Sequence, residues 1–299
     1  SPKILIEAMG EVKPHLICIV PLILEKIYRK QIKPSLEKGV VKLAMRVPLL
    51  DTQVYASVCN RLTESFGGEF TQVIAGGAPL NSEVEEFLHK IKFRFTVGYG
   101  LTECAPLISY TYYKDFIPTS CGRVLDGLME AKIDSPDPQR IPGEICVRGE
   151  HVMKGYYKNP EATRQVIDEE GWLHTGDIGT MNEDNTLFIK GRSKSMILSA
   201  NGQNIYPEEI ESKLNNMSCV LESLVVERDG KLVALVYPDY EQADEAGISY
   251  SDIQRVMDEN KEVLNTLVAP YEQVTKIMLW PNEFEKTPKK SIKRFLYNR

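Results

Sequence analysis

Hydrophobic and polar positions follow two different periods along residues 1–115. Apolar residues three or four positions apart predict helices over residues 1–12, 22–31, 38–64 with a break at Pro48, and 81–90, the last capped by Asn81. Short apolar or alternating runs predict strands over residues 15–20, 71–75 and 91–97. Because strands and helices take turns in this order, we expect a parallel α/β layer, whose ligands bind beyond the carboxyl ends of the strands.

Glycine turns follow two of these predicted strands. Gly76-Gly77-Ala78-Pro79 comes after residues 71–75, and the strand over 91–97 is predicted to stop at Gly98-Tyr99-Gly100. Thr102 and Glu103 come next, offering a donor for phosphate and a hard oxygen for Mg²⁺. An aromatic ring, a hydroxyl and a carboxylate side by side indicate a nucleotide site. A tyrosine between glycines is also common in plain turns, and this alternative stays open.

The pattern changes twice further along the chain. Residues 118–190 predict a small β subdomain, with strands over 130–133, 143–148 and 187–190 separated by turns such as Asn182–Asn185. A third regime follows, with a helix after Tyr206-Pro207, strands over 223–227 and 233–237, and a helix over 251–267. The acidic piece Asp239–Glu245 is interpreted as a solvated loop. The predicted domains are therefore residues 1–117, 118–191 and 192–299.

Composition narrows the function classes. The 299 residues carry a net charge of -6, which argues against nucleic acid as a partner. The longest apolar stretch, residues 16–24, is interrupted by Pro21 and is too short to span a bilayer. Six cysteines without a CxxC pair predict a reduced cytoplasmic chain with buried thiols, and the four histidines show no metal-ligand spacing.

The end of the chain is basic. A solvated terminus is the favoured interpretation, and attraction to nucleotide phosphates or to the anionic inner face of a membrane is the sharper one. The cations concerned are Lys286, Lys289, Lys290, Lys293, Arg294 and Arg299.

Four further motifs occur in a fixed order around the Val97–Glu103 stretch. They are Gly76–Leu80; Pro142–Gly149 with Gly155-Tyr156-Tyr157; Gly171–Asp177; and Gly191–Ile197, which continues through Asn201-Gly202 into Tyr206–Glu211. Together they resemble the adenylate-forming (AMP-binding) superfamily, which includes acyl-CoA synthetases, luciferases and adenylation domains. The resemblance implies the second half of the large domain (an α/β layer plus a small β subdomain), followed by a small mobile α+β C-terminal domain.

The resemblance also assigns roles to residues. It implies that Gly77 and Ala78 on one side and Tyr99 with Gly100 on the other sandwich the adenine of ATP or AMP. Thr102 would contact phosphate, and Glu103 would hold Mg²⁺. Asp177 would accept from the ribose hydroxyls with help from Arg192. The alternatives from the residues alone are a turn-stabilising aspartate for Asp177 and a surface ion pair for Arg192.

The resemblance also implies roles for three further positions. Lys194 corresponds to the hinge between the large and small domains, and Gly202 would line the channel for the pantetheine arm of CoA. A plain Asn-Gly turn explains Gly202 equally well. The family's late lysine is replaced by Ser291 here. Lys290, the nearest in sequence, is predicted to take over its contact with the acyl carboxylate and α-phosphate, and Lys289 and Lys293 stay open as alternatives because they would share the face of Ser291 in an extended segment.

The resemblance is closest to long-chain fatty acid CoA ligases, because of the long helical stretch between Pro21 and Gly76. It implies that a fatty acid, ATP and CoA are the substrates, with Mg²⁺ as cofactor. The family's Ser/Thr/Gly-rich phosphate loop is missing from the printed sequence, so we expect a carboxyl-terminal fragment that does not catalyse alone. The rivals are an adenylation domain that loads a carrier protein and a non-catalytic nucleotide-binding module. The sequence leaves chain-length preference and oligomeric state open.

Overall fold

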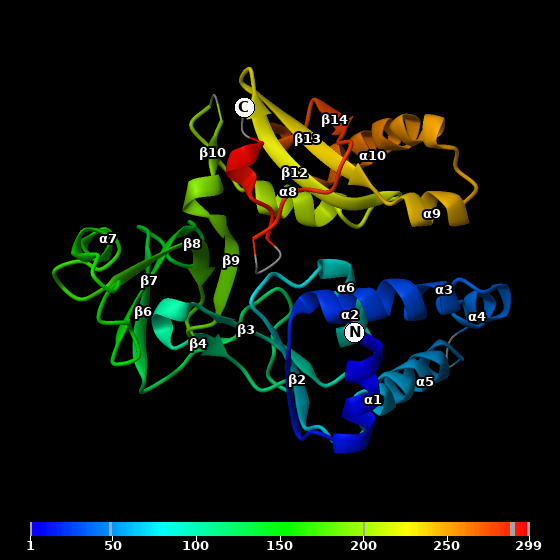
Figure 1. Ribbon diagram of the computed structural model, residues 1–299, viewed down its shortest axis with the longest axis horizontal. Helices are drawn as coiled ribbons and strands as arrows, with labels where there is room; N and C mark the ends of the chain where they lie inside the picture. The colour runs from blue at the N-terminus through cyan, green and yellow to red at the C-terminus, as the bar shows by residue number, and fades with distance from the viewer. Residues whose placement is uncertain (1, 48–49, 200, 288–290, 298–299) are drawn as a thin grey trace. The chain divides into compact units, whose positions relative to one another are not determined.

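The computed structural model describes residues 2–47, 50–199, 201–287 and 291–297 and shows a mixed α/β fold (Figure 1). The chain divides into two compact units. The first comprises Ser1–Ile141, Cys146–Thr175 and Thr180–Phe188, and the second comprises Pro142–Ile145, Gly176–Gly179 and Ile189–Arg299. Each unit is described by itself below.

A five-stranded sheet forms the centre of the first unit, in the order β1-β2-β3-β4-β5. Its strands are β1 (Leu16–Ile19), β2 (Gln72–Gly76), β3 (Phe95–Gly100), β4 (Leu107–Tyr110) and β5 (Arg123–Val124). β1, β2 and β3 are parallel, whereas β4 and β5 are antiparallel to their neighbours. The expected parallel α/β layer is therefore confirmed, and Gly76 lies opposite Gly98 in the register of β2 and β3.

Helices of this unit contribute residues such as Leu24, Leu62 and Leu88 to its apolar core. They are α1 (Pro2–Val12), α2 (Pro21–Ile27), the π-helical turn η1 (Tyr28–Ile32), α3 (Lys33–Leu36), α4 (Gly39–Ala44), α5 (Leu50–Ser65) and α6 (Ser82–Lys90). Pro21 occupies the first turn of α2, where a missing backbone N–H costs no hydrogen bond. Phe66 and Phe70 at the end of α5 are fully buried and contact the ring of Phe93.

The predicted strand over residues 91–97 is wrong in its limits. Ile91 and Lys92 instead close α6: the N–H of Phe93 donates to Leu88 O at 3.0 Å, and Lys92 takes a left-handed φ of 57°. This is the hydrogen-bond pattern with which many helices end. β3 begins only at Phe95 and runs through Tyr99 to Gly100, so the strand includes the tyrosine that was expected to stop it.

The four-stranded sheet has the order β6-β7-β8-β9. Its strands are β6 (Met129–Asp134), β7 (Gly143–Gly149), β8 (Leu173–Met181) and β9 (Leu187–Arg192), and the short helix α7 (Pro160–Arg164) follows β7 in the chain. Three of these strands were predicted, and β8 was missed. Its sequence holds His174, Gly176 and Asp177, which do not form an apolar strand pattern, and Gly176 has a φ of +72°.

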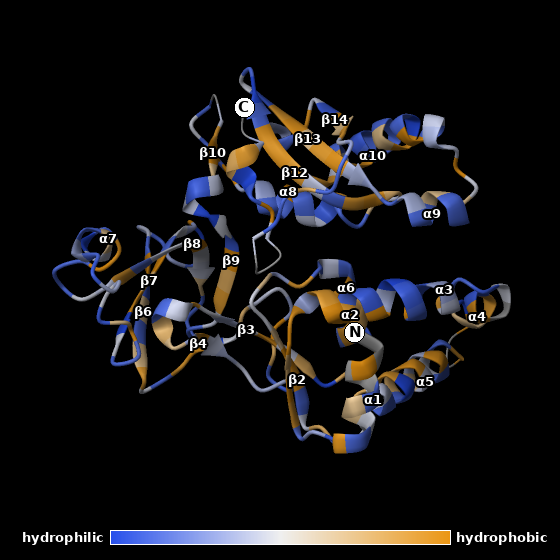
Figure 2. Cartoon of the chain, in the orientation of Figure 1, coloured by the Kyte–Doolittle hydropathy of each residue, from blue (hydrophilic) through white to orange (hydrophobic). Residues whose placement is uncertain are grey.

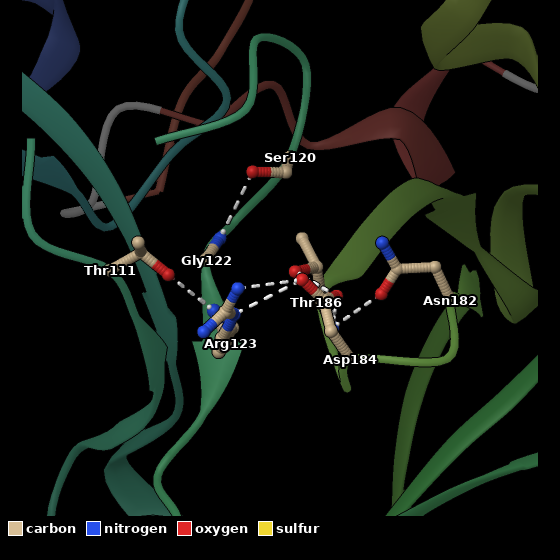
Figure 3. Close-up of polar contacts among 7 residues, drawn as sticks. All are labelled: Thr111, Ser120, Gly122, Arg123, Asn182, Asp184 and Thr186. Atoms are coloured by element: carbon tan, nitrogen blue, oxygen red, sulfur yellow. Dashed lines mark hydrogen bonds and ion pairs between the residues drawn. The ribbon is translucent and has the colours of Figure 1, made fainter. Parts of the chain in front are cut away.

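A polar network in the first unit ties β5 to the turn between β8 and β9 (Figure 3). Arg123 forms an ion pair with Asp184 at 2.8 Å, and its N–H donates to Thr111 Oγ1 at 2.8 Å. Asn182 Oδ1 and Asp184 Oδ1 accept from the N–H and hydroxyl of Thr186, at 2.8 and 2.7 Å. The predicted turn at Asn182–Asn185 is confirmed. Through its ion pair with Arg123, the Asp184 carboxylate also binds this turn to β5 of the five-stranded sheet.

The second unit is built on a three-stranded sheet in the order β12-β13-β14. Its elements are β10 (Ile197–Leu198), β11 (Asn204–Ile205), α8 (Pro207–Leu214), β12 (Val220–Arg228), β13 (Lys231–Pro238), α9 (Tyr240–Glu245), α10 (Ile253–Leu267) and β14 (Lys276–Leu279). β12 and β13 are orange along most of their length in Figure 2, consistent with their buried Val225, Ala234 and Leu235. Asp229 and Gly230 both have positive φ, as a two-residue hairpin requires.

Short 3₁₀ turns complete the described structure. They are η2 (Thr102–Cys104), η3 (Ser193–Ser195), η4 (Tyr250–Asp252), η5 (Pro270–Glu272) and η6 (Arg294–Leu296). No helix among the described residues is long and apolar enough to cross a bilayer. Cys104, Cys146 and Cys219 are buried as expected, but Cys18 is exposed, so the expectation of buried thiols holds only in part.

The acidic piece 239–245 is not a loop. Asp239 caps α9, and its carboxylate accepts from the N–H of Gln242 at 3.0 Å. Ala243 faces the core and is fully buried. One small apolar residue at the right place, together with an N-cap, is enough to fold a segment whose charge favoured solvent.

The basic end of the chain is not a solvated terminus in its described part. Lys286 forms an ion pair with Glu222, Lys293 with Glu285 at 3.2 Å, and Arg294 with Glu211. The rings of Phe284 and Tyr297 pack against Trp280 in a separate apolar cluster. Lys289, Lys290 and Arg299 lie outside the described residues. The cations that can be placed are thus neutralised by acids of the same unit.

Candidate functional site

The loop after β2 exposes backbone at the end of the parallel sheet. Gly77 has a φ of +85°, and a Cβ there would meet no atom within 4 Å, so conformation rather than crowding requires glycine. Gly77 and Ala78 are exposed, whereas Leu80 is buried and anchors the loop. The loop ends at Asn81, which caps α6 and whose own N–H donates to Glu25 Oε1 at 3.1 Å. Burial raises the pKa of that Glu25 carboxyl.

Tyr99 lies at the end of the neighbouring strand and is 8% exposed. The two glycines beside it have different reasons. A Cβ at Gly98 would make ordinary contacts, but a Cβ at Gly100 would overlap the carbonyl oxygen of Pro106. Gly100 is therefore required by close packing within the chain. The carbonyl oxygen of Pro106 is held in this place because it also accepts from the N–H of Leu101 at 2.8 Å.

Thr102 and Glu103 form the 3₁₀ turn η2 directly after β3. The turn closes at Ala105, which has a left-handed φ of 55°. Such a conformation is uncommon for alanine and is typical of turns under tertiary constraint. Thr102 is exposed and Glu103 half-buried, so both side chains can reach a ligand at the end of the sheet.

Glu103 is held by a second loop, to which the sequence motifs gave no role. The hydroxyl of Tyr156 donates to Glu103 Oε1 at 3.0 Å, and the N–H of Met153 donates to the backbone carbonyl of Glu103 at 2.8 Å. Burial, and then the hydrogen bond and charge of Glu103, raise the pKa of Tyr156. Tyr156 was visible in the sequence only as part of Gly155-Tyr156-Tyr157.

Asp177 and Arg192 come together in the second unit. Their atoms Oδ1 and Nε are 2.8 Å apart; the Asp177 side chain is 6% exposed and that of Arg192 is 56% exposed. Beside them, Glu144 Oε1 accepts from the N–H of Gly176 at 2.9 Å. A nearly buried carboxylate with one exposed cationic partner can accept hydrogen bonds from a diol, and it is equally an ion pair. Asp177 lies inside β8, so the alternative of a turn-stabilising aspartate is wrong, whereas the ion-pair alternative for Arg192 stays open beside the ribose role.

The remaining candidates of the second unit lie on η3 and the adjoining hairpin. Lys194 is exposed within η3. Gly202 belongs to the turn joining β10 and β11, where its N–H donates to Ser199 O at 2.9 Å. It is exposed with a φ of +77°, and a Cβ there would meet no atom within 4 Å, so turn geometry alone accounts for the glycine. Lys290 lies outside the described residues.

Glu103 is the candidate for holding a metal ion in the first unit. Mg²⁺ binds through one or two carboxylates together with substrate phosphates and waters, and Glu103 beside the exposed hydroxyl of Thr102 suits that pattern. His174 instead makes contacts within the protein, with Cys146 Sγ at 3.5 Å and with Asp168 at 3.5 Å.

Residues 1–157 match the family described as AMP-binding enzyme, and the chain belongs to that family. It is 41% identical to 4-coumarate--CoA ligase 5 of Oryza sativa subsp. japonica over 167 residues, which are 52% of this chain and 30% of the relative. It is 30% identical to long-chain-fatty-acid--CoA ligase 5 of Rattus norvegicus over 327 aligned positions, covering 94% of this chain and 46% of the relative.

The fold agrees with this assignment. The adenylation domain of a carboxylate reductase from Mycobacterium chelonae superimposes with a TM-score of 0.76 at 20% identity, covering 98% of this chain and 46% of that one. The expected fold class is confirmed. The chain spans between about a third and about half of the curated relatives it matches.

Proposed function

We propose that this chain is part of an ATP-dependent, AMP-forming acyl-CoA ligase. The observation that carries the proposal is the register of β2 and β3, which sets Gly76 opposite Gly98 and so brings the Gly76–Leu80 loop and the Tyr99–Glu103 turn to one end of the sheet. The family match covers both segments. Ligands of parallel α/β sheets bind at this end.

The reaction proceeds in two steps. A carboxylate attacks the α-phosphorus of ATP to give an acyl-adenylate and pyrophosphate, and the thiol of CoA then displaces AMP. We assign adenine to Gly77, Ala78, Tyr99 and Gly100, and phosphate to Thr102. A magnesium ion on Glu103 would offset charge on the phosphates.

In the second unit, Asp177 and Arg192 are assigned to the ribose. The carboxylate of Asp177 is almost fully buried, so a diol that replaces water there makes strong hydrogen bonds. Lys194 is the proposed hinge, Gly202 the proposed contact of the pantetheine arm, and Lys290 the proposed partner of the acyl carboxylate.

A long-chain fatty acid is the proposed acyl substrate. The relative whose name carries that substrate aligns with 94% of this chain, whereas the 41% identical relative named for 4-coumarate aligns with 52%. The higher identity of the latter favours an aromatic acid as the second candidate. CoA consumption by the full protein with palmitate and with 4-coumarate distinguishes them, and consumption with neither acid overturns both assignments.

The nucleotide site is tested on the 299-residue chain. We expect a fluorescent ATP analogue to bind, and Asp177→Asn to weaken binding at least about tenfold, since a charge-assisted hydrogen bond to the ribose is lost. Asp258→Asn, an exposed aspartate on α10, is the matched control. Equal affinity of all three proteins refutes the ribose assignment.

A further inference from the structure

Tyr156 links two segments of the first unit that are far apart in sequence. Its hydroxyl donates to Glu103 Oε1 at 3.0 Å across 53 positions of the chain. The same loop also binds the backbone of Glu103 through the N–H of Met153, at 2.8 Å. Glu103 is therefore fixed at both its main chain and its side chain by residues 153–156.

The loop that carries Tyr156 is itself fixed. The N–H of Tyr156 donates to Thr163 Oγ1 at 2.9 Å, and this hydroxyl donates onward to Asn159 O at 2.9 Å. Gly155 has a φ of +143°, and a Cβ there would lie 2.8 Å from Thr163 Cγ2. Only glycine fits against Thr163 at this position. The backbone before Tyr156 is therefore held in one conformation, in which the Tyr156 hydroxyl reaches Glu103.

The partner of Glu103 is neutral. Within the described part of the chain no Lys, Arg or His forms an ion pair with Glu103, and its side-chain partner is a phenol, which carries no positive charge. A neutral donor orients a carboxylate without cancelling its charge. An arginine in the same place would orient it and also compete with a divalent cation.

We propose that Tyr156 is a positioning residue for the cation site of Glu103: it holds Oε1 in one orientation so that the carboxylate keeps its charge and its second oxygen for a divalent cation bound with nucleotide. This inference rests on the proposed function of Glu103. Partners that orient a metal-binding carboxylate typically change metal affinity by about 10- to 100-fold when removed.

The test uses the full protein and measures ATP affinity by calorimetry, once with Mg²⁺ and once with EDTA. Tyr156→Phe removes the hydroxyl and keeps the ring. We expect the magnesium-dependent gain in affinity to fall about 10- to 100-fold, with affinity in EDTA unchanged. Tyr157→Phe is the matched control, because Tyr157 is adjacent and 88% exposed. In a Glu103→Gln background, Tyr156→Phe should have no further effect.

The outcomes distinguish the positioning role of Tyr156 from the metal-binding role of Glu103. A wild-type magnesium gain in Tyr156→Phe overturns the positioning role and leaves the function of Glu103 intact. An equal loss with and without Mg²⁺ also overturns it, since the hydroxyl then only supports the loop. If the wild-type protein binds ATP with no magnesium effect and Glu103→Gln changes nothing, both the inference and the metal role of Glu103 are wrong.

Discussion

The carboxyl of Glu211 should make the stability of the second unit depend on pH. Glu211 is buried on α8, where it accepts from the N–H of Val225 at 2.6 Å and forms an ion pair with Arg294. Glu208, on the same helix, lies 3.4 Å from the same guanidinium. One arginine thus faces two acids. Burial, opposed by Arg294 and reinforced by the charge of Glu208, raises the pKa of Glu211 from 4.5 to about 7.

The sign and size of this pH dependence follow from the difference in pKa between the folded and the unfolded chain. A carboxyl whose pKa is higher in the folded than in the unfolded chain binds its proton more tightly when folded. Its contribution to stability is therefore complete below pH 4.5 and is lost as the pH rises through about 7. At about 1.4 kcal/mol for each pKa unit, the loss across this window is of the order of 3 kcal/mol. Glu211→Gln has no such proton and should lack this part of the pH dependence.

Urea unfolding followed by the fluorescence of Trp280 provides the assay. Trp280 contacts Phe284 and Tyr297 in the second unit, and Trp172, the other tryptophan, is changed to Phe in every protein so that it does not contribute. Unfolding free energies are compared at pH 5 and pH 7.5. Glu259→Gln removes an exposed acid of α10 and serves as the control. The reasoning is refuted if the difference between the two pH values is the same in Glu211→Gln and in the Glu211 protein.

Two glycines and one cap give further predictions. Gly100→Ala should lower the unfolding free energy of the first unit by about 1–3 kcal/mol in urea titration, because the methyl group overlaps the carbonyl of Pro106; unchanged stability would contradict the packing described. Gly202→Ala and Gly202→Asn should both slow CoA transfer in the full protein, because a side chain would block the proposed pantetheine channel; normal transfer by Gly202→Asn, whose side chain tolerates the φ of +77°, would leave Gly202 only its role in the turn. Asp239→Ala should cost about 1 kcal/mol, measured by the same urea titration, through loss of the cap of α9, and a smaller loss in Asp239→Asn is the check.

The sequence predicts the parallel layer well because its periodicity and caps agree. Pro21 and Asn81 both lie where α2 and α6 begin, and each acts locally. The limits of β3 could not be predicted in this way. Ile91 and Phe93 are apolar because they close α6 over the core, and their alternation with Lys92 imitates a strand. β8 was missed for the opposite reason, since His174, Gly176 and Asp177 interrupt the apolar pattern of a strand that is mostly buried.

The candidate site, like the fold, could be predicted only where the signal is local in the sequence. Glu103 and Asp177 could be singled out from motif order, and each has a nearby partner in its own unit. Tyr156 could not be connected with Glu103, because their hydrogen bond joins positions 53 apart and depends on how Gly155 packs against Thr163. The basic tail was misjudged likewise, since its partners Glu211 and Glu222 lie far upstream.

The link between Arg294 and Glu211 also bears on how this unit is made in the cell. Glu211 lies on α8, the first α-helix of the unit, and is synthesised 83 residues before its cation. Until the ribosome has released residues 284–297, that acid is without its cation, and Leu224 and Leu235 lack the covering rings of Phe284 and Tyr297. Folding of the second unit therefore waits for residues 284–297, and a nascent chain stopped before Arg294 leaves the apolar surface of Leu224 and Leu235 uncovered.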